Sequence, residues 1–341
     1  MSHSIGNDQH TRLVWKGAME QQNTESSTTK FHEIKKEVAK RIVGQEELIE
    51  RLLIALLVEG HVLLEGVPGL AKTRTLLALT DSINAKMARI QFTPDLLPSD
   101  IIGTEVYQPQ LGTFSTRTGP IFTNLLLADE INRAPAKVQS ALLQAMQERS
   151  VTIGHETHPL PSPFMVLATQ NPIEQEGTYT LPEAQVDRFL MKLVVTYPSF
   201  DEELKIINLD SSKDSTGKQD IQKVISSEEL PDYRTIVQNV YADEKIDRYI
   251  VSLVHATRTP TAYGLEGMVD WGASPRASIA LRQCAKAHAF LRGRDFVSPD
   301  DVKALAYDVL RHRILVSFEA EARGITSDEI IKTLLNSIAV P

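Results

Sequence analysis

Residues 61–82 read HVLLEGVPGLAKTRTLLALTDS, and this stretch decides the fold. The apolar run His61–Glu65 predicts a short buried strand, and apolar spacing predicts a helix from about Lys72 to Asp81. A loop rich in Gly and Pro joins the two. A glycine loop between a strand and a helix is typical of phosphate binding, because backbone N–H groups and the helix N-terminus point at the anion.

The loop has the spacing of a P-loop, with one departure from the general pattern. It consists of Gly66, Val67, Pro68, Gly69, Leu70, Ala71, Lys72 and Thr73. In a P-loop, Lys72 reaches the β- and γ-phosphates of ATP and Thr73 holds Mg²⁺. Ala71 stands where the general pattern has its second glycine, and a positive φ there would be strained. The alternative is a glycine turn that binds nothing.

Two further apolar strands end in polar residues. Leu125–Ala128 is followed by Asp129 and Glu130, and Phe164–Ala168 is followed by Thr169-Gln170-Asn171-Pro172. In parallel sheets, ligand-binding and catalytic residues lie at the carboxyl ends of the strands. We expect Asp129 to hold Mg²⁺ through water, Glu130 to polarise the water that attacks ATP, and Asn171 to orient that water. The alternatives are an ordinary strand end and an Asn-Pro turn.

The order of these elements predicts an α/β fold over residues 31–200. Strands are also expected at Met87–Phe92 and Met191–Val195, and the alternation with helices favours a parallel sheet covered on both faces, an αβα sandwich. Two helices separated at Gly44 precede the first strand. Insertions with hairpin patterns are expected near residues 93–121 and 150–163.

The two ends of the chain differ from this core. Residues 1–30 are polar and predict a flexible N-terminal arm, and residues 201–223 contain a polar segment that predicts a linker. Residues 224–341 predict a helical domain, with capping Ser-Pro pairs opening helices near Arg276 and Asp300. The run Arg311-His312-Arg313 at a helix end is interpreted as complementing the helix dipole.

Composition excludes several classes of protein. The chain has 341 residues, 42% of them hydrophobic, which excludes disorder of the whole chain. The net charge of −8 disfavours nucleic acid as the main partner, and the single cysteine, Cys284, excludes an intramolecular disulfide and a multi-cysteine metal site. No apolar run approaches the roughly 18 residues of a membrane span, and no N-terminal signal pattern is present. We therefore expect a cytoplasmic protein.

Two arginines complete the set of candidate residues. Arg188 follows a helix that begins near Leu181, and Arg276 lies in the first turn of a later helix. The planar, permanently charged guanidinium of arginine can bind phosphate oxygens in two places. Taken singly, each arginine is better explained as a solvated or salt-bridged surface residue.

Four segments together resemble the AAA+ ATPases, and the MoxR family in particular. They are LLEGVPGLAKT, LLLADEINRAPAKVQSALLQAMQER, ATQNPIEQEGTYTLPEAQVDRFL and SPRA. The resemblance covers about residues 31–340. The P-loop of this family carries AKT, so Ala71 agrees with the narrower pattern.

The resemblance implies an αβα core followed by a small helical lid, with ATP between them and Mg²⁺ beside it. It also implies a homo-oligomeric ring, usually a hexamer. By the family pattern Asn171 is sensor 1, Arg276 is sensor 2, and Arg188 is the arginine finger given to the next subunit. Val43, Gly44 and Gln45 would line the adenine pocket, and Arg133 and Arg149 are further candidates for the subunit interface. The two insertions would face the pore of the ring and hold a client protein.

The leading functional hypothesis is an ATP-driven, chaperone-like motor that matures a partner complex. The resemblance implies a separate protein with a von Willebrand factor A domain as partner. One alternative is a scaffold that binds ATP to assemble but hydrolyses it negligibly, against which Glu130 argues. Another is the motor of a magnesium-chelatase-like or DNA-acting complex, whose DNA-acting form is disfavoured by the acidic net charge.

Overall fold

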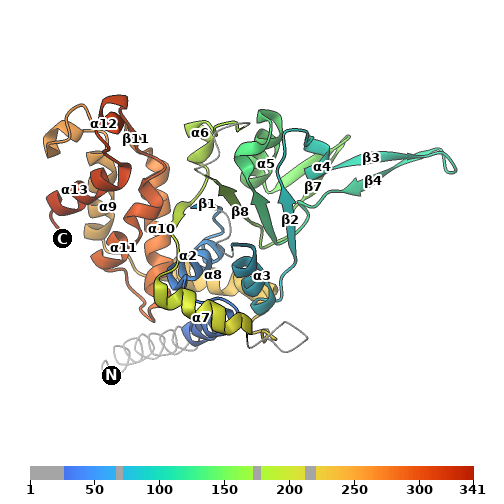
Figure 1. Ribbon diagram of the computed structural model, residues 1–341, viewed down its shortest axis with the longest axis horizontal. Coiled ribbons are helices and arrows are strands. Elements are labelled where there is room, and N and C mark those ends of the chain that lie inside the picture. Colours follow the sequence, from blue (N-terminus) through green and yellow to red (C-terminus); the bar gives the residue numbers. More distant parts are fainter. Residues whose placement is uncertain (1–26, 67–71, 172–177, 212–219) are drawn as a thin grey trace, which may run out of the picture.

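The protein is built on a five-stranded parallel sheet with the strand order β2-β5-β8-β1-β9 (Figure 1). The computed structural model describes residues 27–66, 72–171, 178–211 and 220–341. The strands are β1 (Val62–Gly66), β2 (Met87–Gln91), β5 (Leu125–Asp129), β8 (Met165–Gln170) and β9 (Met191–Val195). Each lies within two residues of the strand expected from the sequence. The predicted α/β class and parallel sheet are therefore confirmed.

Each face of the sheet is covered by a different hydrophobic cluster, because side chains alternate along a strand. Leu64 and Leu127 point toward the helix over residues 27–39, α2 (Glu46–Leu57) and α3 (Lys72–Ser82). Leu63 and Leu126 point to the other side, toward α5 (Ala136–Glu148). Burial on both faces accounts for the continuous apolar runs of these strands.

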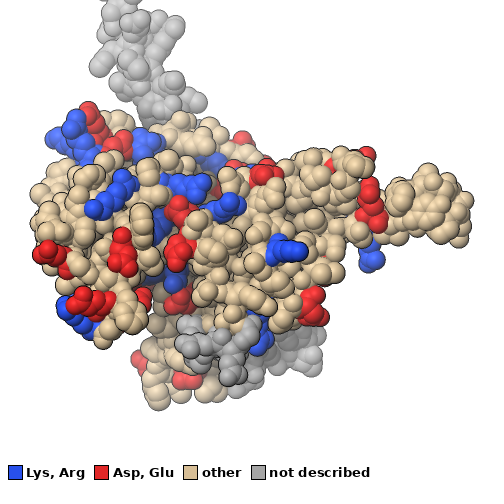
Figure 2. Space-filling view, turned by 90° about the horizontal axis from the view of Figure 1, so that it is seen from above, with Lys and Arg blue, Asp and Glu red and all other residues tan. Residues whose placement is uncertain are grey.

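The insertion expected near residues 93–121 contains a long hairpin that projects from the body (Figure 1). After α4 (Pro98–Ile102), strands β3 (Gly103–Gln108) and β4 (Thr113–Thr118) pair antiparallel. Residues 106–116 contain no charged side chain, and the far end of the hairpin is uncharged in the space-filling view (Figure 2). There the exposed rings of Tyr107 and Phe114 lie 5.2 Å apart.

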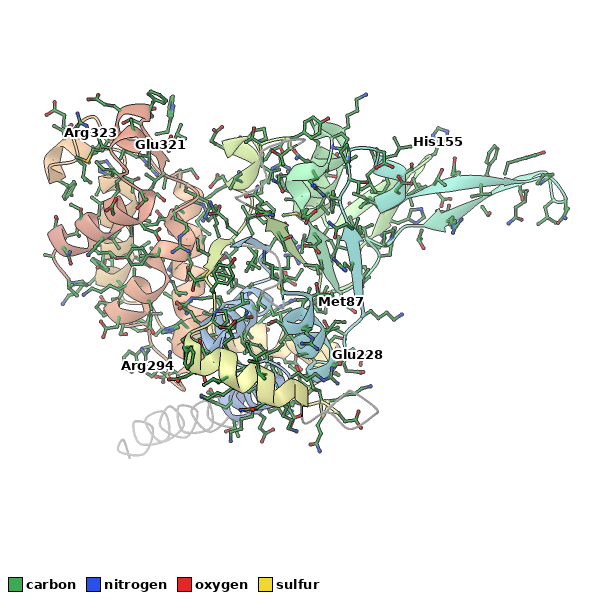
Figure 3. The ribbon with its side chains drawn as sticks, viewed as in Figure 1. Met87, His155, Glu228, Arg294, Glu321 and Arg323 are labelled. Atoms are coloured by element: carbon green, nitrogen blue, oxygen red, sulfur yellow. The ribbon has the colours of Figure 1, made fainter. Side chains whose placement is uncertain are left out.

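The second expected insertion is a shorter hairpin. Strands β6 (Ser150–Ile153) and β7 (Glu156–Pro159) pair antiparallel, and His155 lies in the turn between them (Figure 3). This turn lies against the base of the long hairpin, where a Cβ on Gly154 would come within 2.2 Å of Glu105. The two insertions therefore support each other at one side of the sheet.

Two segments differ from the sequence expectations. Helix α7 (Phe200–Ser211) occupies the first half of the segment 201–223 that was expected to be a linker. Its start is a capping box, since Glu202 accepts from the N–H of Ser199 and the Ser199 hydroxyl lies near the Glu202 N–H. The first helix begins by residue 27, four residues inside the expected arm, and the Thr28 hydroxyl donates to the carbonyl of Phe290 at 3.0 Å. Residues 1–26 lie outside the described part.

The C-terminal part is mainly helical, as expected. Its elements are η2 (Ser227–Glu229), α8 (Leu230–Asn239), α9 (Glu244–Ala256), η3 (Pro260–Tyr263), β10 (Val269–Trp271), α10 (Pro275–Leu291), α11 (Pro299–Leu310), β11 (Leu315–Val316), α12 (Phe318–Ala322) and α13 (Ser327–Ser337). Two short helices, η1 (Ile131–Arg133) and α6 (Glu183–Val186), belong to the core. In the part of the chain that the structure describes, no helix has both the length and the apolar character to cross a membrane.

The core and the helical part share one hydrophobic cluster. The ring of Phe31, from the first helix, packs edge-on against Tyr233 of α8 and Phe290 of α10. Cys284 of α10 is fully buried in the same cluster, and burial raises the pKa of its thiol to about 12. The helical part is therefore packed onto the core rather than tethered to it by a loop.

Candidate functional site

Several chemically active side chains converge at the carboxyl edge of the sheet. Strand β2 starts at Met87 on the lower side of the view in Figure 3, and the parallel strands all end on the opposite side. Lys72, at the start of α3, donates from Nζ to the carbonyl of Gly66 at 2.6 Å. Burial lowers the pKa of Lys72, while the charges of Asp129 and Glu130 raise it. The two carboxylates therefore favour the charged form of Lys72.

Residues Val67, Pro68, Gly69, Leu70 and Ala71 of the expected P-loop lie outside the described residues. The two ends that hold this loop are described. Gly66 ends β1 in close contact with β9, where a Cβ would meet the Val195 carbonyl at 2.9 Å. Lys72 and the partly exposed Thr73 begin α3. The structure therefore shows the strand that ends at Gly66 and the helix that begins at Lys72, on either side of the expected loop.

Asp129 is held by groups from both neighbouring strands. The Thr169 hydroxyl of β8 donates to Oδ1 of Asp129 at 2.6 Å, and Arg89 of β2 donates to Oδ2 from Nη2 at 2.6 Å. Both are charge-assisted hydrogen bonds. Arg89 was not identified from the sequence, because its proximity to Asp129 follows from the pairing of β2 with β5.

Glu130 has a left-handed backbone with φ 58° and ψ 51°. Its N–H donates to the Thr169 hydroxyl at 2.9 Å, so one hydroxyl contacts both acidic residues. Oε2 of Glu130 accepts from Gln91 Nε2 at 2.7 Å and from Arg133 Nη1 at 3.2 Å. Gln91, like Arg89, comes from β2 and was not identified from the sequence.

Asn171 lies at the tip of β8 and is 8% exposed. It lines a cavity of about 340 Å³, together with Glu65 and Lys192 from the neighbouring strands and His312 from the helical part. Nζ of Lys192 is 2.6 Å from Oε2 of Glu65. Asn171 therefore follows the end of β8, the strand next to β5, as the sequence predicts.

The four arginines differ in what holds them. Arg188 is exposed and donates from Nη1 to the carbonyl of Leu143 at 3.1 Å. Arg276 is 57% exposed at its side chain, with Nη1 3.4 Å from Oδ2 of Asp187. Arg133 contacts Glu130, as described. Arg149 donates to Oε2 of Glu59 at 2.5 Å, and Glu59 also pairs with Arg234.

The turn formed by Val43, Gly44 and Gln45 lies between three helices. Gln45 is the left-handed N-cap of α2, and its Oε1 accepts from the Thr75 hydroxyl of α3 at 3.1 Å. Gly44 has φ +69°, and a Cβ there would come within 2.5 Å of Oε1 of Glu202 in α7. This places the turn beside the helix that begins with Lys72.

The oxygen donors at the site match the preferences of Mg²⁺. Thr73 offers a hydroxyl and Asp129 a carboxylate, and Mg²⁺ commonly takes one or two protein oxygens together with phosphates and water. Among the described residues, no group of three or more His, Cys, Asp or Glu side chains could hold a metal. The donor set therefore fits a metal that arrives with a phosphate ligand.

Comparisons with known proteins show which family the chain resembles. Residues 61–191 match the model of the "ATPase family associated with various cellular activities (AAA)", and residues 262–334 match the AAA lid domain. Chaperone MoxR1 of Mycobacterium tuberculosis is 49% identical over 308 residues, which cover 89% of this chain and 81% of that protein. Protein MoxR of Methylorubrum extorquens is 30% identical, with 90% and 94% covered.

A solved structure extends the agreement to three dimensions. The crystal structure of a candidate ATPase from Cytophaga hutchinsonii superposes with a TM-score of 0.89 at 48% identity. The match covers 96% of this chain and 99% of that one. The sequence identities, the match to the lid domain and the structural superposition agree. The chain belongs to the MoxR family of AAA+ ATPases.

Proposed function

We propose that this protein hydrolyses ATP at the carboxyl edge of the sheet and uses the energy to remodel a partner protein complex. The observation that carries the proposal is that Lys72 begins α3 at the same edge of the sheet where β5 ends in Asp129 and Glu130, both of which the Thr169 hydroxyl contacts. A lysine at a helix N-terminus binds phosphate oxygens, and a carboxylate beside it can polarise an attacking water. Family membership supports ATP as the nucleotide.

In this proposal each residue at the edge has a separate role. Lys72 binds the β- and γ-phosphates, Thr73 and Asp129 hold Mg²⁺, Glu130 polarises the water, and Asn171 orients it. Bound Mg²⁺ supplies positive charge to the phosphates. Val43, Gly44 and Gln45 border the base, and Arg276 approaches the γ-phosphate from the lid.

Arg188 is proposed as the finger that acts on the ATP of a neighbouring subunit. Its exposure supports this role, since its hydrogen bond to the Leu143 carbonyl is exchanged easily for a phosphate. Arg149 is engaged by Glu59 and Arg133 by Glu130 within the same chain, which favours Arg188 over both. A trans-acting finger requires a neighbouring subunit at each site, and we propose a closed ring of six.

The β3–β4 hairpin is proposed to contact the client. It projects from the body, and its uncharged end exposes Leu111 and Phe114 at 70% and 67%. A separate protein with a von Willebrand factor A domain is proposed as partner, and the cytoplasm as the location. A pulldown that recovers no such partner would contradict the partner assignment.

Sedimentation with and without ATP–Mg²⁺, together with phosphate release, tests the proposal. ATP is expected to assemble the wild type, and Arg188→Ala is expected to assemble but to hydrolyse about 10³–10⁵ times more slowly. Arg323→Ala is the matched control, because Arg323 is a surface arginine of the lid (Figure 3). It pairs with Glu319. Arg323→Ala should leave turnover unchanged.

Mixing two inactive variants tests whether the finger acts in trans. Glu130→Gln subunits keep Arg188, and Arg188→Ala subunits keep Glu130, so mixed rings should regain part of the turnover. Hydrolysis by a monomer, or full activity of Arg188→Ala, would show that the finger is assigned wrongly.

A further inference from the structure

The run Arg311-His312-Arg313 forms the seam between the lid and the core. These residues follow α11 and donate to backbone carbonyls near β9. Arg313 donates to Phe189 at 2.7 Å and to Leu190 at 3.1 Å, His312 donates to Phe189 at 3.1 Å, and Arg311 donates to Lys192 at 3.0 Å. The run therefore does more than complement a helix dipole, which was the interpretation from the sequence.

Asp187 lies at this seam and is bound from the lid on both of its oxygens. Nε of Arg313 donates to Oδ1 at 2.8 Å. Oδ2 accepts from the Ser274 hydroxyl at 3.2 Å and faces Nη1 of Arg276 at 3.4 Å. One carboxylate thus connects a buried arginine and an exposed arginine of the same domain.

The two arginines bind Asp187 with very different strength. The Arg313 side chain is 3% exposed and also donates to the carbonyls of Asp187 and Val309, so its guanidinium is fully engaged. The Arg276 side chain is 57% exposed and makes one long contact to Asp187. An exposed ion pair contributes little free energy, whereas breaking a buried one leaves uncompensated charge. Arg276 can therefore leave Asp187, and Arg313 cannot.

We infer that Asp187 is a positioning residue that holds Arg276 until a triphosphate replaces it, while Arg313 keeps Asp187 in place. The inference rests on the proposed function, in which Arg276 approaches the γ-phosphate. A γ-phosphate carries more charge than a carboxylate and accepts from the same guanidinium fork, so it competes with Asp187 for Arg276. ADP has no γ-phosphate and leaves the Asp187–Arg276 contact intact.

The same anchor bears on Arg188, the next residue in the chain. Arg313 binds the carbonyls of Asp187 and Phe189, which flank Arg188 on either side. The backbone that carries the proposed finger is thereby fixed to the lid. Asp187 then contacts the arginine that senses ATP within the subunit, and it is joined directly to the arginine offered to the neighbour.

Nucleotide affinity of Asp187→Asn tests the inference. Asparagine keeps the size of the side chain and still accepts from Arg313, but it removes the charge that holds Arg276. The affinity for ATP is expected to rise about two- to fivefold, the range of an exposed ion pair, while the affinity for ADP stays unchanged. In an Arg276→Ala background, Asp187→Asn should have no effect on either affinity.

Asp328→Asn is the matched control. Asp328 accepts from Nε of Arg311 at 3.0 Å, within the same run, but it contacts neither Asp187 nor Arg276 in the described interactions. It should leave the ratio of ATP to ADP affinity at the wild-type value. If Asp187→Asn does not fold, Asp187→Glu is the second variant, because it keeps a negative charge for Arg313 but moves the carboxylate away from its present contact with Arg276. It is expected to change the affinity for ATP and not that for ADP.

The outcomes separate this inference from the proposed function. If the wild type binds and hydrolyses ATP but Asp187→Asn changes ATP and ADP affinity equally, the inference is overturned and the function stands. The same holds if the effect persists without Arg276. If the wild type binds no ATP, both are overturned.

Discussion

Glu130 shows how the site imposes a conformation on a single residue. A side chain with a Cβ costs roughly 1–2 kcal/mol in the left-handed region, yet Glu130 occupies it with φ 58°. Its N–H is held by the Thr169 hydroxyl, and its carboxylate by Gln91 and Arg133. Such strain persists where the surroundings over-determine it, and it is concentrated at functional sites.

Glu130→Gln is expected to lower ATP hydrolysis by about 10²–10⁴-fold and to leave ATP binding intact. Glutamine has the same size, but its neutral amide polarises water poorly. The measurement is phosphate release alongside retention of ATP on the assembled protein. Glu148→Gln is the control, because Glu148 is an exposed residue of α5 whose carboxylate contacts Gln144. Unchanged turnover in Glu130→Gln would favour the scaffold hypothesis instead.

The sequence predicts the site residues that lie next to strand ends, and misses those brought there by pairing. Asp129 and Asn171 lie at or just after the ends of apolar strands, and Lys72 begins the helix after the glycine loop, so their place at the carboxyl edge follows from local pattern. Arg89 reaches Asp129 because β2 pairs in parallel with β5, which local pattern does not encode. Arg313 reaches Asp187 across 126 positions of sequence.

At the scale of elements, the β3–β4 hairpin depends on two glycines at its base. A Cβ on Gly103 would lie 2.2 Å from the Arg117 carbonyl, and one on Gly119 would lie 2.1 Å from the Ile101 carbonyl. Both neighbours are backbone, so neither can move without opening the base. The hairpin and the body are thus joined by a close backbone contact.

Gly103→Ala is therefore expected to loosen the hairpin while the sheet stays folded. Faster limited proteolysis between residues 103 and 119 would report it. Gly112→Ala is the matched control: Gly112 also has a positive φ, +64°, but a Cβ there meets nothing within 4 Å. It should cost only the left-handed penalty, about 1 kcal/mol. Equal proteolysis of the two variants would show that the close contact is not what holds the base.

His61 joins three elements at the opposite end of β1. Its Nδ1 accepts from the N–H of Val166 in β8 at 3.0 Å, and its Nε2 donates to the carbonyl of Met146 in α5 at 3.1 Å. The bond from Val166 requires the neutral ring, because Nδ1 can accept only when it carries no proton. Burial lowers the pKa of His61 to about 4, and protonation would displace the Val166 N–H.

The free energy of unfolding should therefore decrease as the pH falls from about 6.5 toward 4. In that range the unfolded chain binds a proton at His61 that the folded chain does not. The total loss is about 3 kcal/mol, from the difference between the two pKa values. Denaturant unfolding of the wild type and of His61→Gln at several pH values measures it. Parallel pH profiles would contradict the assignment to His61, since His288 and His312 titrate in both proteins.

At the scale of the whole molecule, the sequence predicts two domains but not how they are joined. The polar segment near residue 210 indicates a boundary, and α10 and α11 begin where the capping Ser-Pro pairs place them. The apolar faces of those helices do not specify a partner. In the structure Phe31 and Leu52 of the core, and Leu281 and Phe290 of the lid, belong to one cluster.

Cys284 can report on the contact between the core and the lid, because it lies in the hydrophobic cluster that the two share. Cys284 is fully buried near the charged side chains of Arg51, Asp308 and Arg313. Burial raises the pKa of its thiol to about 12, so the thiol stays protonated. A thiol reagent can reach it only when α10 separates from its neighbours, so the alkylation rate under native conditions measures how often the joint opens. ATP should slow that reaction if it draws lid and core together, and alkylation at the rate of a free thiol would mean that the joint is open most of the time. Because the chain has no other cysteine, the alkylation rate reports the exposure of this one thiol.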